Sequence, residues 1–228
     1  MVQAKLDSLP AELSFEAYRV WQPPDDRQYE LFGGRLIPMN PPTPLHVNIS
    51  QFLVYQFQRY FAERGIELVA KSEAGVRTEQ ASSRIPDVVV CTRHLWEKIC
   101  SRPGSGILDF TQEELPRLVV EVISTNWQDD YLWKRAEYAV ICIPEYWIVD
   151  YHRQQVWVLT NPARPDGYDV AKYAPGDQVE SAEFEGFSLM VDDLLNPPLV
   201  EELMRQVQLK QNAMAAKLRD LGVDPESL

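Results

Sequence analysis

The stretch LVVEVIS (Leu118–Ser124) has the composition of a buried β-strand, yet an acidic residue, Glu121, stands at its centre. Runs of Leu, Val and Ile at this density are typical of strands covered on both faces of a sheet. An ionised carboxylate inside such a strand is unfavourable unless a partner compensates its charge. A second acid has the same setting, because Asp87 lies within IPDVVV (Ile85–Val90). We therefore ask what the two acids face.

The spacing of these acids suggests a metal site. Asp87 and Glu121 are 34 positions apart (121 − 87), which leaves room for a helix and a loop between two neighbouring strands. Neighbouring strands place side chains about 5 Å apart on one face. Two acids at that distance repel each other, and a hard cation such as Mg²⁺ or Mn²⁺ would compensate them. Taken singly, Asp87 could merely start its strand and Glu121 could have a structural role.

Two more residues, Lys134 and Glu30, are candidates for the same site. Lys134 follows in the next expected helix, with Asp130 and Tyr138 four residues away on either side. A lysine above two carboxylates could orient an attacking water or neutralise charge on a phosphoryl group. Glu30 could supply a third acid. The alternatives are that Lys134 lies on an exposed helical face and that Glu30 points to solvent from an edge strand. His46 is interpreted as a surface histidine whose hydrogen bonds are satisfied.

The remaining patterns predict a mixture of helices and strands. Helices are expected at residues 14–21, 43–65, 92–100, 127–143 and 199–221, and strands at 29–32, 35–39, 66–70, 73–79, 85–91, 118–124, 145–151, 154–160, 167–173, 177–184 and 187–191. Ser14 and Thr43 are expected N-caps, and Gly33–Gly34 is expected to form a hairpin turn. This order predicts an α/β fold on the border of α+β, with one mixed central sheet flanked by helices.

The helix expected at 127–143 has an apolar face and a charged face. The apolar set, expected to be buried, is Leu132, Ala136, Ala139 and Val140, and the charged set, expected off that face, is Asp129, Asp130, Lys134 and Glu137. Ser124 and Thr125 are expected to cap this helix.

Two segments are expected along the chain. Residues 1–198 are predicted to form one domain and residues 199–228 a helical extension. The apolar seam of this last helix is thin, so it either folds back on the body or pairs with another subunit.

Composition narrows the class of protein. The net charge of −12 argues against a general nucleic-acid binder, although several basic residues gather in one third of the chain. No run of eighteen apolar residues exists, so no membrane span is expected, and the first ten residues lack the features of a signal peptide. The three cysteines lack CxxC spacing and are expected to be free and mostly buried, as in a protein of the reducing cytoplasm.

Several motifs in order carry a family resemblance. They are YELFGGRLIPMNPPTPLH (29–46), IPDVVV (85–90), LVVEVIS (118–124), D-x₃-K-x₃-Y (130–138) and IPEYWIVD (143–150). This set resembles a large family, abundant in cyanobacteria, of restriction endonuclease-like proteins within the PD-(D/E)XK nuclease superfamily. The resemblance extends from about residue 14 to 195.

The resemblance implies a restriction-endonuclease-like core that holds a divalent metal, Mg²⁺ or Mn²⁺, between two acids. Asp87 matches the acid of the PD motif, and Glu121 matches the first acid of (D/E)XK. Ile123 stands where the superfamily pattern has lysine. Members of this group supply the lysine from the following helix, which points to Lys134.

Two further ligands follow from the resemblance. Glu30 matches the acid of the YEL motif and would be a further metal or water ligand. The backbone carbonyl of Val122 would complete the metal shell.

The function implied is that of a metal-dependent endonuclease that hydrolyses phosphodiester bonds. Nucleic acid, with DNA favoured, would be its partner, and a homodimer is expected by analogy because a duplex has two strands to cut. Two rival functions stay open. One is a non-catalytic binding or regulatory module that kept the fold, and the other is a structural homodimer that uses the C-terminal helix and the hairpin at 145–159.

Overall fold

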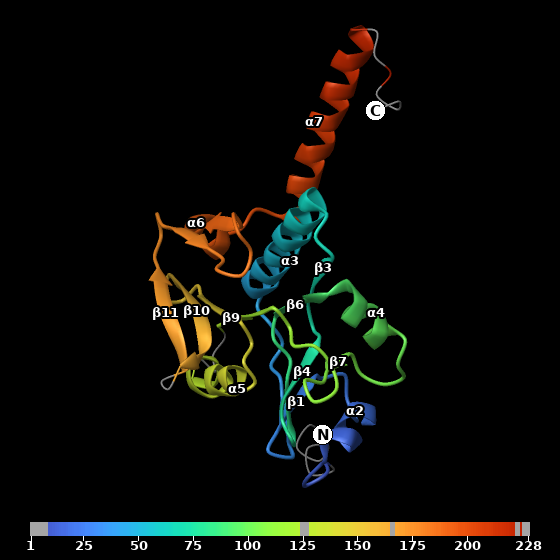
Figure 1. Cartoon of the computed structure of the whole chain (residues 1–228), viewed down its shortest axis with the longest axis vertical. Coiled ribbons are helices and arrows are strands. Elements are labelled where there is room, and N and C mark those ends of the chain that lie inside the picture. Colours follow the sequence, from blue (N-terminus) through green and yellow to red (C-terminus); the bar gives the residue numbers. More distant parts are fainter. Residues whose placement is uncertain (1–8, 124–127, 165–166, 222–223, 225–228) are drawn as a thin grey trace.

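The largest element of the structure is a six-stranded mixed sheet (Figure 1). The computed structural model describes residues 9–123, 128–164, 167–221 and 224. Across the sheet the strands are β11 (Gly167–Tyr173), β10 (Gln155–Arg164), β9 (Glu145–Asp150), β8 (Leu118–Val122), β6 (Val88–Thr92) and β3 (Leu68–Lys71). Strands β8 and β9 run parallel, and the other neighbouring pairs are antiparallel. A parallel pair needs a crossover connection, which the helical segment between β8 and β9 provides.

A long helix, α3 (Pro44–Arg64), covers one face of this sheet. The Thr43 hydroxyl caps its start by accepting a hydrogen bond from the His46 amide at 3.2 Å. Gly65 ends the helix in the left-handed conformation, with a φ of 63°. Both ends confirm the prediction from the sequence.

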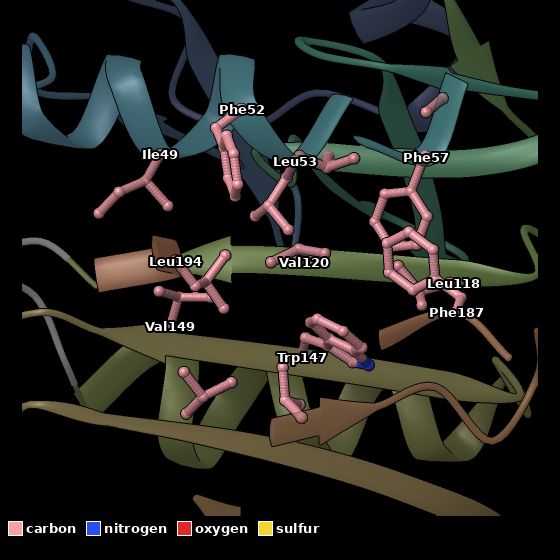
Figure 2. Packing of buried hydrophobic residues seen from close by; sticks show 14 of the residues in the cluster. Ile49, Phe52, Leu53, Phe57, Leu118, Val120, Trp147, Val149, Phe187 and Leu194 are labelled. Atoms are coloured by element: carbon pink, nitrogen blue, oxygen red, sulfur yellow. The ribbon is translucent and has the colours of Figure 1, made fainter. Parts of the chain in front are cut away.

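The core between α3 and the sheet fixes the direction of Glu121. Figure 2 shows four α3 side chains meeting those of β8 and β9, namely Ile49, Phe52, Leu53 and Phe57 against Leu118, Val120, Trp147 and Val149. Successive side chains of a strand point to opposite faces. Val119 and Ile123 accordingly pack on the other face of the sheet, in the same core cluster as Tyr138. Glu121 shares that second face.

A second sheet of five strands stands beside the first. Its order is β2 (Arg35–Pro38), β1 (Tyr29–Phe32), β5 (Ser82–Arg84), β4 (Gly75–Glu79) and β7 (Ile107–Leu108). The predicted fold class is confirmed, since mixed sheets are flanked by helices, but the expectation of one sheet is wrong. Pro86 lies between β5 and β6 and has no amide hydrogen for a strand ladder, so the chain leaves one sheet and enters the other there.

Shorter elements complete the body. The predicted helices and strands include α2 (Phe15–Val20), α4 (Arg93–Cys100), β12 (Gln178–Glu180) and β13 (Ser188–Met190), whereas β5, β7 and α6 (Val191–Leu195) were not predicted. The three cysteines are free, as expected, but Cys100 and Cys142 are exposed, so the expectation that they are mostly buried is wrong.

The last helix, α7 (Val200–Asp220), projects from the body beyond the end of α3 (Figure 1). It contains no buried residue in the part that the structure describes. Leu203, near its start, is partly buried against the core. The division into residues 1–198 and 199–228 stays a prediction. Among the described helices, α7 included, none is long and apolar enough to cross a bilayer.

One buried acid of the main sheet lies outside any candidate site. The carboxylate of Glu145, at the start of β9, accepts hydrogen bonds from the Ser181 hydroxyl at 2.9 Å and from the Glu183 amide at 2.7 Å. Burial nevertheless raises the pKa of Glu145 above its ordinary value of 4.5, because the hydrogen bonds lower it by less.

This raised pKa predicts the sign of a pH effect on stability. The folded state binds the Glu145 proton more tightly than the unfolded state, so the free energy of unfolding should fall as the pH rises from about 4.5 through the raised pKa. The Glu145→Gln variant lacks this titration. Urea denaturation between pH 4 and 7 should show that wild-type protein loses stability relative to the variant as the pH rises. A difference that grows in favour of wild-type protein would contradict the assignment.

Candidate active site

Glu121 is buried and bonded to two side chains of the crossover segment. The Lys134 ammonium donates to Glu121 Oε2 at 2.9 Å, and the Tyr138 hydroxyl donates to Oε1 at 2.8 Å. Lys134 belongs to a π-helical turn, η1 (Asp129–Lys134), and Tyr138 to the helix that follows it, α5 (Arg135–Val140). The carboxylate of Glu121, in β8, is thus held by two side chains of the helical segment that follows β8.

Lys134 joins three carboxylates from different parts of the chain. Besides Glu121, its ammonium lies 3.2 Å from Asp130 Oδ1 and 3.4 Å from Glu30 Oε1. Burial alone would lower the pKa of Lys134, but the three acids raise it well above its ordinary value. Lys134 therefore stays protonated and links β1 of one sheet to β8 of the other.

Arg84, the last residue of β5, organises the other side of the site. Its guanidinium donates to Glu30 Oε2 at 3.0 Å, to Asp129 Oδ2 at 3.3 Å and, through Nε, to Glu137 Oε2 at 2.9 Å. The Thr78 hydroxyl also donates to Glu137, at 2.6 Å. Arg84 and Lys134 together with the acids they contact form what we call the ionic cluster: Glu30, Arg84, Glu121, Asp129, Asp130, Lys134 and Glu137.

Negative charge exceeds positive charge in the ionic cluster, which contains five carboxylates and two cations. Burial raises the pKa of Glu30, but Lys134 and Arg84 outweigh burial, so its pKa is lowered. Burial, followed by the nearby acids, raises the pKa of Glu121 well above its ordinary value despite Lys134. Burial likewise raises the pKa of Asp130 to about 6. Glu121 and Asp130 are therefore the acids of the ionic cluster whose ionised form is least favoured without a further cation.

Asp87 lies at the edge of the ionic cluster, just before β6. Its Oδ1 is 2.6 Å from His46 Nε2, and its Oδ2 accepts a hydrogen bond from the Val122 amide at 2.7 Å. The antiparallel register of β6 and β8 pairs Val88 with Val120, so the next positions along it are Asp87 and Glu121. The Asp87 charge contributes to the raised pKa of Glu121. With 18% of its side chain exposed, Asp87 faces solvent more than Glu121 does.

The structure thus brings Glu30 and Glu121 to the ammonium of Lys134, so three of the residues that the sequence suggested lie together. It places Asp87 beside them but bonded to other groups. The Val122 amide is used by Asp87, and the proposed role of the Val122 carbonyl stays a prediction.

The predicted buried face of the crossover helix is wrong. Leu132 and Val140 are 58% and 76% exposed, whereas Lys134 and Glu137 are buried. The charged side chains turn inward because Arg84 and the facing acids compensate them, and two tyrosines, Tyr131 and Tyr138, supply the apolar contacts of this face. Ser124 and Thr125, the expected caps, lie outside the described residues.

Besides the acids Asp129, Asp130 and Glu137, two residues of the site, Arg84 and His46, were given no role in it from the sequence. Arg84 precedes IPDVVV without any local pattern that marks it. His46, interpreted as a surface residue, is only 9% exposed, so that interpretation is wrong. The sequence contained a signal that His46 is buried, because His46 lies three residues before Ile49 and seven before Leu53, on the buried face of α3.

The chemistry of these residues fits a divalent cation of the Mg²⁺ or Mn²⁺ type. Within the described ranges, no three acids, histidines or cysteines form a ready-made set of ligands. Mg²⁺ does not need such a set, since it usually keeps several waters and takes one or two carboxylates. Asp87 and Glu121 supply two carboxylates next to a buried cluster with excess negative charge.

Comparisons with known proteins agree with this architecture. A family model, Uma2, described as "Putative restriction endonuclease", matches residues 15–192. The fold is similar to a crystal structure from Anabaena variabilis ATCC 29413, described as "a putative nuclease belonging to DUF820". The TM-score is 0.57 at 18% sequence identity, over 76% of this chain and 93% of that chain. No curated protein matches the chain. At this identity the crystal structure shows a shared fold.

Proposed function

Because this chain belongs to the Uma2 family, described as "Putative restriction endonuclease", we propose that it is a metal-dependent endonuclease that hydrolyses phosphodiester bonds in nucleic acid. The family confirms the resemblance seen in the sequence. One observation carries the proposal: Lys134 bonds to Glu121, next to Asp87, inside a buried cluster with more acids than cations. A chain that needed only stability would gain little from a buried cluster in which acids outnumber cations.

Asp87 and Glu121 would hold the metal, with Glu30 and the Val122 carbonyl as further ligands. Bound Mg²⁺ or Mn²⁺ would polarise the scissile phosphate and supply an activated water. The residues fit this role by their chemistry, since both are carboxylates, and a cation beside Glu121 would favour its ionised form, which burial and the neighbouring acids oppose. Tyr138 bonds to the Glu121 oxygen that Lys134 leaves free, which fixes the orientation of the carboxylate toward a metal.

Lys134 would stabilise the negative charge that develops on the phosphoryl oxygens. The surrounding carboxylates keep its ammonium protonated, which this role requires. Ile123, at the position where the superfamily pattern has lysine, is buried among apolar side chains and offers no cation. The lysine from η1 is thus the group that reaches Glu121, in agreement with a migrated lysine.

The partner proposed is nucleic acid, with DNA favoured. The acidic chain, with a net charge of −12, gains no general attraction for a polyanion. A substrate phosphate would approach from the side of Asp87 and Asp129, whose side chains are the more exposed acids of the site. The expected homodimer stays a prediction, to be checked by analytical ultracentrifugation.

A non-catalytic module is the second candidate, and one observation favours it. Lys134 is engaged by three carboxylates, as in a salt-bridge network that serves structure alone. Such a module would bind no divalent metal and cleave nothing.

The two candidates are separated by a cleavage experiment. The purified chain is incubated with single-stranded, double-stranded and structured DNA and RNA, with Mn²⁺ or with EDTA. We expect cleavage of at least one substrate class that requires the metal. A Glu121→Gln preparation, purified in the same way, controls for contaminating nucleases. Equal cleavage by the two preparations, or none by the wild-type chain on any substrate, would overturn the endonuclease proposal.

A further inference from the structure

His46 occupies a rigid position at the start of α3. Its amide is capped by the Thr43 hydroxyl at 3.2 Å, and its carbonyl accepts a hydrogen bond from the Ser50 hydroxyl at 3.0 Å. Pro44 fixes the backbone of the first turn. The imidazole is therefore presented from a well-defined point of the helix, on the face of α3 that packs on the main sheet.

The imidazole and one backbone amide together hold both oxygens of Asp87. His46 Nε2 lies 2.6 Å from Oδ1, and the Val122 amide donates to Oδ2 at 2.7 Å. An ionised carboxylate only accepts hydrogen bonds, so Nε2 must be the nitrogen that donates. Asp87 is thus fixed by α3 and by β8, at the residue that follows Glu121.

The second ring nitrogen of His46 makes this arrangement costly. Nδ1 is buried and has no hydrogen-bond partner among the residues that the structure describes. An unsatisfied buried polar atom costs about 1–3 kcal/mol. A histidine kept only for packing could be replaced by an apolar residue without that cost, which points to a use for its other nitrogen.

We propose that His46 is a positioning residue, which orients the Asp87 carboxylate for a divalent cation through the hydrogen bond from Nε2. The inference rests on the proposed function, because Asp87 is a metal ligand only if that function is correct. Carboxylates that bind metals are commonly oriented by such outer partners, and the loss of one typically lowers metal affinity about 10- to 100-fold. His46 itself does not bind the cation in this proposal, since Nε2 carries the proton and Nδ1 is buried.

Isothermal titration calorimetry with Mn²⁺ tests this role. We expect His46→Leu to weaken Mn²⁺ binding about 10- to 100-fold. His46→Gln, which can place an amide donor near Asp87, should keep most of the affinity, whereas the shorter His46→Asn should not. His94→Leu and His152→Leu remove the other two histidines of the chain, both exposed, and should leave the affinity unchanged.

Controls separate positioning from folding and from direct ligation. Thermal unfolding in EDTA identifies the variants that fold. If His46→Leu does not fold, the comparison of His46→Gln with His46→Asn still tests the positioning role. Wild-type affinity in both His46→Leu and His46→Asn would overturn the positioning role alone. A ¹⁴N coupling from His46 to bound Mn²⁺ in pulsed electron paramagnetic resonance would overturn it in favour of direct ligation. If wild-type protein binds no Mn²⁺, the proposed metal site fails, and this inference with it.

Discussion

Replacing Lys134 with methionine is expected to lower the rate of metal-dependent cleavage about 10²- to 10³-fold, the usual effect of removing one group that stabilises transition-state charge. Methionine retains a long flexible side chain but removes the ammonium that contacts Glu121, Asp130 and Glu30. The measurement is single-turnover cleavage of the preferred substrate with saturating Mn²⁺.

Metal affinity should distinguish the role of Lys134 from that of a ligand. The proposed ligands, Asp87 and Glu121, remain in Lys134→Met, and Glu121 loses a competing cation. We therefore expect Mn²⁺ affinity to stay equal or to rise while the cleavage rate falls. Lys98→Met is a matched control, because Lys98 is half exposed on α4 and pairs with Glu113 outside the ionic cluster. Undiminished cleavage by Lys134→Met would assign the catalytic cation to another residue.

Replacing Arg84 with methionine is expected to lower the free energy of unfolding by about 3–5 kcal/mol. Arg84 is buried and bonded to Glu30, Asp129 and Glu137. Its loss leaves the buried Glu137 without the arginine that compensates it and leaves Glu30 with Lys134 alone. Urea denaturation followed by circular dichroism measures the change.

Two further variants test the cause of this loss. Arg93→Met removes a surface arginine whose pair with Glu67 is mostly exposed, and such pairs contribute about 0–1 kcal/mol. The double variant Arg84→Met/Glu137→Gln removes one of the stranded charges and should recover part of the stability. If Arg84→Met is no less stable than Arg93→Met, the buried cluster is not a main determinant of stability.

Local signals predicted much of the fold. Thr43 and Gly65 mark the ends of α3 through capping and a left-handed backbone, both of which depend on neighbouring residues. The separate five-stranded sheet was missed, because two of its strands, β5 and β7, have only three and two residues and leave no alternating pattern. Pro86 was the available signal that the chain passes from one sheet to the other between β5 and β6.

Less of the candidate site than of the fold could be predicted, because the site depends more on contacts between distant residues. Glu121 could be found because a carboxylate in an apolar strand violates the local pattern. The inward face of η1 and α5 could not be found in this way, because the partner of Glu137 is Arg84, which lies 53 positions earlier in the sequence. His46 and Asp87 are likewise 41 positions apart. Pattern analysis assumes that apolar residues are buried, and it fails where distant charges compensate one another.

The passage of the chain from β5 to β6 has a consequence for how this protein can tolerate changes in length. Arg84 and Asp87 belong to two different bonding networks, and the Ile85 amide between them donates to Glu30 at 2.9 Å. One inserted residue would advance the chain by about 3.3 Å and turn the following side chains to the opposite face. The segment from Arg84 to Asp87 therefore has a fixed length. We expect an insertion or deletion in it to disrupt one of the two networks, whereas a substitution at Ile85 that keeps the backbone conformation should be tolerated.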